Sequence, residues 1–403
     1  MRTKRAYLLI SIFVAASLLL AACGGDLATP TSVPAAATST SAPAAATDTT
    51  APAAATDTTA PAAATSTSAP STGGVPAGKI AILLPETKTA RYETQDLPNF
   101  KAELQAKGFD LNNLIYSNAN QDASAQQQQA EAAITNGAKV LVLDPVDSAA
   151  AAAIADAAKA KGVPVVSYDR LITGSDAVAY YLSFDNAQVG KLQGESLLQA
   201  LSGKTNPSIV MINGSPTDNN AKLFKAGAHS VLDGKVTIAK EYDTPDWSPD
   251  QAQNEMQQAL TALGNKVDGV YAANDGTAGG AIAAMKSAGL SPLPPVTGQD
   301  AEVAGIQRIL AGEQYMTVYK AIKSEAMAAA DLALVLLGGQ TPPASMVNGK
   351  VNNGKIDVPS VLLVPVAVTK SNINDTVIKD GCWKASDICP ADFAAACTAA
   401  GIK

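Results

Sequence analysis

Histidine is nearly absent from this sequence, which contains His229 and no other. A lone imidazole argues against a histidine-rich metal site and against a serine–histidine–aspartate triad, so we expect His229 to be an ordinary surface position on a helix. Positive charge is also scarce, because 29 lysines and arginines face 36 acidic residues and the formal net charge is −7. Nucleic-acid binding needs a positive surface that displaces counterions, so we expect no nucleic-acid partner.

Long apolar runs are missing apart from residues 6–20, and these 15 residues fall short of the roughly 20 that a membrane-spanning helix needs. Three basic residues precede the run, Arg2, Lys4 and Arg5, in the order typical of a secretory signal. Cys23 follows Leu20-Ala21-Ala22, which resembles a bacterial lipobox. That resemblance implies removal of a signal peptide at residues 1–22 and lipidation of Cys23, since two or more acyl chains anchor a protein stably. A plain secretory signal with a chance cysteine is the alternative.

Large side chains are nearly absent from residues 26–77, which consist mainly of alanine, threonine, serine and proline. A nine-residue unit at 51–59 returns with small changes at 60–68. With no core to bury, this stretch cannot offset its ordering entropy, so we predict a disordered tether over residues 23–77. About 50 flexible residues span roughly 40 Å.

From residue 79 onward, short apolar stretches alternate with amphipathic ones. The predicted strands lie at 79–84, up to 115–116, and at 139–143, 163–168, 208–212, 236–239, 267–272, 295–297 and 316–318. Helices are predicted near 94–107, 121–136, 148–161, 186–202, 219–233, 250–263, 277–288, 302–311 and 322–337. Buried strands separated by helices indicate parallel sheets covered on both faces. About 300 residues of this pattern predict an α/β protein with two Rossmann-like lobes.

Polar and aromatic side chains follow the ends of most predicted strands, where ligands bind in sheets of this kind. The set comprises Arg91, Tyr92, Asp169, Arg170, Asn220, Trp247, Asn274, Asp300 and Lys320. Sugar hydroxyls both donate and accept hydrogen bonds, so carboxylates, amides and guanidinium groups suit them. The C–H face of a sugar ring packs on an aromatic face. The pattern therefore predicts a carbohydrate site with no cofactor.

Several of the side chains at the strand ends also have a structural explanation. Asp185, Asp218 and Asp275 stand where they could cap the following helices. Trp247 could plug a surface loop, and Asp169 with Arg170 could form only an ion pair between lobes. The repetition at successive strand ends is what favours a binding site.

Several stretches resemble the D-xylose-binding proteins, within the type I periplasmic solute-binding proteins that serve sugar ABC transporters. They are Ser167–Arg170, Tyr181–Asn186 with Val189 and Gly190, Gly214–Phe224, Asn274–Ile282, Gly298–Ala301, Met316–Lys320 and Asp375–Gly381. The resemblance implies two hinged lobes that close on a monosaccharide, a monomer, and delivery to an ABC permease in the cell membrane. It also implies that the nine residues above contact the sugar. The family usually has tryptophan where this chain has Tyr92, which leaves the choice of sugar open.

Three crossings between the lobes are expected, near Asp185, Thr297–Asp300 and Lys320–Lys323. Lobe one would then comprise residues 79–184 and 298–321, and lobe two residues 186–296 and 323–365. Residues 366–403 would form a C-terminal tail that holds three cysteines.

A disulfide is expected in this tail, because the protein is predicted to lie outside the cytoplasm. If residues 390–400 form one helix, Cys389 and Cys397 lie about 12 Å apart along its axis and cannot bond. Cys382 then pairs with one of them, and Cys397 is preferred; a zinc site is the alternative.

Two further functions compete with transport. A sensory protein that presents another pentose, a hexose or a furanosyl signal to a membrane receptor needs the same residues. An enzyme needs paired catalytic groups, and only Glu86 with Asp300 could be imagined so; we therefore expect no enzymatic activity.

Overall fold

The computed structural model describes residues 74–402. The predicted signal peptide, the lipidated Cys23 and nearly all of the predicted tether lie outside the described residues. Within the described part, no helix is both long enough and apolar enough to cross a membrane.

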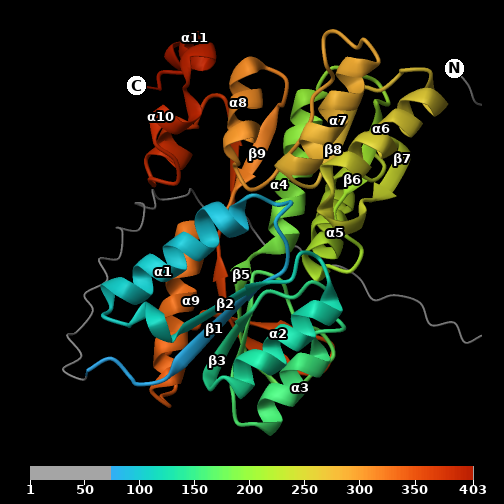
Figure 1. The fold of residues 1–403 in the computed structure, drawn as a ribbon. Coiled ribbons are helices and arrows are strands. Elements are labelled where there is room, and N and C mark those ends of the chain that lie inside the picture. The colour runs from blue at the N-terminus through green and yellow to red at the C-terminus, as the bar shows by residue number, and fades with distance from the viewer. Residues whose placement is uncertain (1–73, 403) are drawn as a thin grey trace, which may run out of the picture. The chain divides into compact units, whose positions relative to one another are not determined.

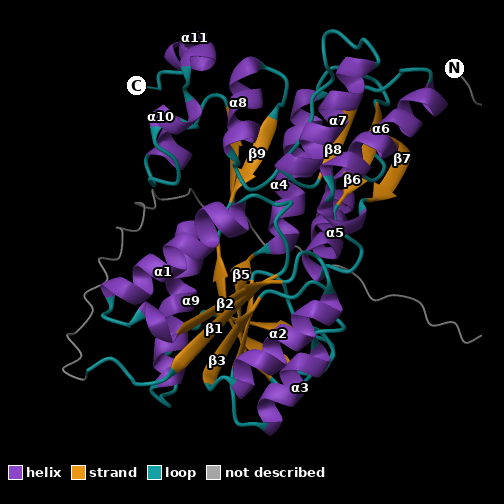
Figure 2. Ribbon diagram, viewed as in Figure 1, coloured by secondary structure: helices purple, strands orange, loops and turns teal. Residues whose placement is uncertain are grey.

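A seven-stranded sheet forms the first lobe (Figures 1 and 2). Its strands, in spatial order, are β10 (Gly349–Asn352), β11 (Asp357–Leu363), β5 (Val178–Phe184), β4 (Val165–Tyr168), β3 (Ala138–Leu143), β1 (Lys79–Leu84) and β2 (Leu114–Asn118). All neighbours are parallel except β10 and β11.

Both faces of this sheet are covered, which explains why β1 is a continuous apolar run. Ile80, Ile82 and Leu84 pack with α1 (Leu97–Ala106) and α9 (Ile322–Leu337). The alternate residues Ala81 and Leu83 belong to the opposite core, with α2 (Ala123–Thr135) and α3 (Ala152–Ala160).

The second lobe is built on a smaller parallel sheet. Its strands are β7 (Thr237–Asp243), β6 (Ser208–Asn213) and β8 (Gly269–Ala272). Helices α4 (Asn186–Ala200) and α5 (Asn219–Leu232) pack on one face, and α6 (Pro249–Leu263) and α7 (Asp275–Ser287) on the other. Beside them, α8 (Val303–Ala311) precedes an antiparallel pair, β9 (Met316–Tyr319) and β12 (Val366–Thr369). The α/β fold with mostly parallel sheets is confirmed.

The chain crosses between the lobes at Asp185, after Tyr319 and after Leu363. Two of these places agree with the sequence prediction, but the crossing predicted at Thr297–Asp300 is wrong. The Thr297 amide donates to Val270 O and the Val318 amide donates to Gly298 O, at 3.1 and 3.0 Å, so this segment lies between β8 and β9 inside the second lobe.

Two segments consequently lie in the opposite lobe from the one predicted. Residues 298–319 belong to the second lobe, because β9 pairs with β12 and α8 contacts α7. Residues 322–363 belong to the first, because β11 pairs with β5 and α9 packs on α1. Lobe one is therefore residues 79–184 and 322–363, and lobe two is residues 186–319 and 366–402.

The C-terminal residues pack on lobe two as a set of short helices. They are η4 (Asn374–Ile378), α10 (Ala385–Ile388), η5 (Ala391–Phe393) and α11 (Ala394–Ala399). Cys389 and Cys397 form a disulfide with a Cα separation of 6.0 Å, and Cys382 is a buried free thiol.

The predicted pairing of Cys382 with Cys397 is therefore wrong. It assumed one helix over residues 390–400, whereas Pro390 is extended, a 3₁₀ turn follows, and α11 begins only at Ala394. The two bonded cysteines thus do not share a helix, and the distance along a helix axis does not separate them.

Candidate functional site

All nine side chains predicted for the site line one cavity between the lobes. Arg91, Tyr92, Asp169 and Arg170 come from lobe one, and Asn220, Trp247, Asn274 and Asp300 from lobe two. Lys320 lies at the second crossing. Four further residues complete the lining, namely Thr89, Asp218, Phe224 and Gln299.

Three carboxylates hold the guanidinium of Arg91, which lines the cavity. Arg91 directly precedes the π-helical turn η1 (Tyr92–Asp96), which places Asp96 against its guanidinium with bonds of 3.0 and 2.7 Å. Glu325 on α9 accepts a third bond at 2.6 Å, and Asp169 a fourth at 3.3 Å. Burial would lower the pKa of Arg91, but these carboxylates raise it well above its ordinary value. Arg91 is therefore a fixed positive charge.

Asp169 is the point where the cations converge. Its carboxylate lies 3.3 Å from Arg91 and 3.7 Å from Lys320, and it accepts a 3.0 Å hydrogen bond from the Tyr92 hydroxyl. Burial alone would raise the pKa of Asp169, but Arg91, Lys320 and Arg170 lower it below its ordinary value. The group is thus a buried carboxylate that stays ionised.

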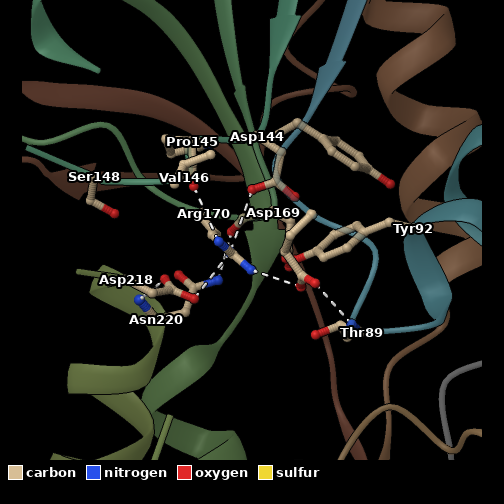
Figure 3. A network of polar contacts seen from close by, with 12 residues as sticks. Thr89, Tyr92, Asp144, Pro145, Val146, Ser148, Asp169, Arg170, Asp218 and Asn220 are labelled. Atoms are coloured by element: carbon tan, nitrogen blue, oxygen red, sulfur yellow. Dashed lines mark hydrogen bonds and ion pairs between the residues drawn. The ribbon is translucent and has the colours of Figure 1, made fainter. Parts of the chain in front are cut away.

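Arg170 joins the two lobes by an ion pair, as Figure 3 shows. Its Nε lies 3.1 Å from Asp218 of lobe two and 3.7 Å from Asp144 of lobe one, and its Nη2 lies 3.5 Å from Glu86 of lobe one. An ion pair between lobes is thus present, but with Asp218 rather than with Asp169. Burial raises the pKa of Asp218, and Arg170 opposes that rise.

Trp247 is buried, with 4% of its surface exposed, and does not plug a surface loop. Its indole N–H donates to Asp218 at 3.1 Å, and its ring centroid lies 6.3 Å from that of Phe224 in an edge-on arrangement. Gly214 permits this position, because a Cβ there would come within 2.0 Å of the indole ring.

Helix capping accounts for part of the polar pattern. Asp185 and Asp218 cap α4 and α5, as predicted. Asp275 does not cap α7; Asn274 does, and it forms a capping box with Thr277. Asp275 instead accepts bonds from Gln314, Thr317 and the Glu302 amide.

Asp300 and Lys320 form a charged pair at 3.0 Å on the lobe-two side of the cavity. The Lys320 ammonium also lies 5.7 and 5.8 Å from the ring centroids of Phe184 and Phe224. Arg91 approaches Asp300 to 3.8 Å, so this carboxylate faces two cations from different parts of the chain.

Four side-chain atoms of the lining are buried without a hydrogen-bond partner among the described residues, namely Thr89 Oγ1, Arg170 Nε, Gln299 Oε1 and Asp300 Oδ1. Buried polar atoms are normally paired, so these point to hydrogen bonds with something in the cavity. From the sequence, Asp218 was expected only to cap a helix, and Gln299 lies within Gly298–Ala301, one of the stretches that carry the resemblance. Phe224 closes a stretch quoted for the resemblance, whereas Thr89 lies in a loop that gave no signal.

Comparison with known proteins assigns the chain to a family. Residues 80–341 match the periplasmic binding protein domain. The D-xylose-binding periplasmic protein of Escherichia coli is 42% identical over 317 residues, which cover 77% of this chain and 92% of that protein. The chain belongs to the periplasmic binding protein family.

Two further members of this family extend the comparison. The multiple sugar-binding periplasmic receptor ChvE of Rhizobium radiobacter is 35% identical, with 77% of this chain and 92% of that protein covered. A carbohydrate transporter solute-binding protein of Chloroflexus aurantiacus, solved with D-glucose, has a TM-score of 0.70 and 35% identity over 76% of this chain and 97% of its own. The resemblance to type I periplasmic sugar-binding proteins is confirmed, and these relatives are binding proteins rather than enzymes, as is this chain.

Proposed function

We propose that this periplasmic binding protein is an extracytoplasmic lipoprotein of an ABC importer. It binds one monosaccharide between its lobes, with D-xylose favoured, and delivers it to the membrane permease. The 42% identity to the E. coli D-xylose-binding protein supports the choice of sugar. The nine predicted residues are the proposed sugar contacts.

The observation that carries this proposal is the lining of the interlobe cavity. Cations, carboxylates and amides are fixed there by bonds to one another, so they offer donors and acceptors in set positions to hydroxyl groups. Tyr92 and Trp247 contribute aromatic surface from opposite lobes.

Sugar binding and lobe closure are one event in this proposal. A ligand that contacts both lobes favours the closed arrangement by its differential affinity for it. Closure also excludes water, which strengthens each hydrogen bond to the sugar. The permease would recognise the closed lobes.

A second candidate is a sensory role, or transport of a different sugar. The identity to ChvE, a multiple sugar-binding receptor, and to the glucose-bound Chloroflexus protein supports it. Tyr92, which stands where the resemblance expects tryptophan, is the residue most suited to alter the choice of sugar.

Calorimetric titration of the protein from Gly24 onward, which lacks the anchor cysteine, tests the sugar assignment. D-xylose is expected to bind one-to-one and more tightly than D-glucose, D-ribose or L-arabinose. Trp247→Ala should abolish that binding, and Asp300→Asn should weaken it to a measurable degree. Tight binding of another sugar would replace xylose, and no binding of any of the four would refute sugar binding.

Cell fractionation tests the anchor separately. The full chain should sediment with membranes, and Cys23→Ser should release it in soluble form. A Cys23→Ser protein that stays with the membrane would show that lipidation at this cysteine is not the anchor.

A further inference from the structure

The C-terminal segment (residues 370–402) is not explained by the proposed function, yet it packs close to the sugar cavity. Its Ile373, Val377 and Ile388 share one buried core with Ile306 of α8 and with Tyr319, the residue before Lys320. Ala301, the residue after Asp300, lies in the same core. Figure 1 shows the segment beside α8 and β9.

The backbone at Asp300 has an unusual conformation that its surroundings must hold. Asp300 and Ala301 have φ angles of 90° and 49°, in a region that residues with a side chain rarely adopt. The Asp300 amide donates to Val318 O at 2.9 Å, and the Ala301 amide donates to the Thr317 hydroxyl at 3.2 Å. Both of these bonds come from β9.

A third bond comes from the C-terminal segment. The indole N–H of Trp383 donates to the Ala301 carbonyl at 2.8 Å. It therefore holds the peptide between Ala301 and Glu302, one residue beyond Asp300, and so restrains the unusual turn at Asp300 and Ala301 from which the Asp300 carboxylate leaves the backbone. That carboxylate lies 3.0 Å from Lys320 and lines the cavity.

The same segment also reaches lobe one. The side-chain amide of Gln95 donates to the Cys382 carbonyl at 3.4 Å. Gln95 lies on η1, the turn that begins at Tyr92 next to Arg91. The Cys389–Cys397 disulfide links α10 to α11 within the segment. The C-terminal segment thus contacts the Gln95 side chain of lobe one and, through Trp383, the Ala301 carbonyl of lobe two.

We propose that Trp383 is a positioning residue for sugar binding, which acts through the Ala301 carbonyl on Asp300. The C-terminal segment would then be a brace that keeps the closed site in shape. This inference rests on the proposed sugar-binding function, because Asp300 must be a sugar contact for its position to affect affinity.

A double-mutant cycle between Trp383→Phe and Asp300→Asn tests the inference. Trp383→Phe keeps an aromatic ring but removes the N–H, and D-xylose affinity should fall by about five- to tenfold, the scale of one hydrogen bond. In the Asp300→Asn background the same change should have little further effect, because the group that it positions is already altered. The sequence has two tryptophans, so Trp247 remains as the single indole reporter of the cavity in Trp383→Phe.

Two controls separate positioning from folding. Phe393→Leu weakens packing in the same core without touching Ala301, and it should lower the unfolding temperature while leaving the xylose affinity unchanged. Replacement of Trp383 by 3-benzothienylalanine keeps the shape of the ring but lacks the N–H, and it should weaken binding as much as Trp383→Phe does.

Each outcome is decisive. Unchanged affinity in both Trp383 variants, or an additive loss in the Asp300→Asn background, would overturn the inference while sugar binding stands. A wild-type protein that binds none of the sugars would overturn the proposed function, and the inference with it.

Discussion

At the scale of single residues, the site is a network of paired charges. Arg91, Arg170 and Lys320 each lie within 3.8 Å of at least two carboxylates. Bringing these ions out of water costs free energy, and only their mutual pairing offsets it. The arrangement fixes the side chains, and its carboxylates outnumber its cations, which disfavours an anionic ligand and is compatible with a neutral sugar.

Asp169→Asn should therefore destabilise the fold as well as weaken sugar binding. The amide leaves Arg91 and Lys320 with one buried partner fewer, and the free energy of unfolding should fall by about 3–5 kcal/mol. Urea denaturation measures the change. Asp176→Asn is the matched control, because Asp176 pairs with Lys159 at 2.9 Å in an exposed position and its loss should change little. Equal effects of the two substitutions would show that the buried pairing is not what stabilises the site.

Asp275 predicts a dependence of stability on pH. Burial raises the pKa of Asp275 from 3.8 to about 7, in spite of Arg308 and the bond from Gln314. Between about pH 4 and pH 7 the folded state then holds more protons than the unfolded state, so the free energy of unfolding falls as pH rises. The thermal midpoint should drop between about pH 4 and pH 7, and Asp275→Asn should remove part of that drop. An unchanged slope in the variant would assign the pH dependence to other buried acids.

At the scale of elements, two loops hold the lobes together beside the sugar cavity. Ser148, in the loop between β3 and α3, donates its amide to Thr217 O at 3.0 Å, and its hydroxyl oxygen accepts from the Asn219 amide at the start of α5, also at 3.0 Å. These bonds form between protein groups only, so they stabilise the closed arrangement without choosing among sugars.

Ser148→Ala should consequently speed sugar dissociation by a few-fold while the ranking of sugars stays the same. The lost hydroxyl leaves the Asn219 amide without its partner in the closed state. Stopped-flow fluorescence of Trp247 measures the rate. Ser230→Ala, an exposed position on α5, is the control and should leave the rate unchanged. If Ser148→Ala altered the order of sugar affinities instead, the contact would belong to the recognition of sugar and not to closure.

At the scale of the molecule, the sequence indicated the class of fold and the side chains that converge. It did not indicate the lobes to which residues 298–319 and 322–363 belong. The rule that ligands lie beyond the ends of parallel strands brought all nine predicted residues to one cavity. Strands β5, β10, β11 and β12 were not predicted. The partner of β11 is β5, with Ser360 opposite Tyr181, and no local pattern reports a pairing across such a separation.

The wrong prediction of the disulfide also arose because contacts with a distant segment decide the local conformation. A proline at position 390 was interpreted as the first residue of a helix, whereas here it is extended and precedes a 3₁₀ turn. Local propensity allows both conformations, and packing of the C-terminal segment against α8 decides between them. Residues whose position depends on contacts with distant segments, such as Thr89 and Trp383, were likewise beyond prediction.

Closure of the whole molecule gives the last prediction. In this structure lobe one and lobe two contact each other directly, through Arg170 with Asp218 and through Ser148 with Thr217 and Asn219. If sugar selects this arrangement, then the protein from residue 74 onward should scatter X-rays in solution as this structure does when saturated with D-xylose, and should have a larger radius of gyration without sugar. Trp247→Ala, which is expected not to bind, should keep the larger radius at the same xylose concentration. Identical scattering with and without sugar in the wild type would mean that the direct contacts alone hold the lobes closed, so that binding would have to proceed by transient opening.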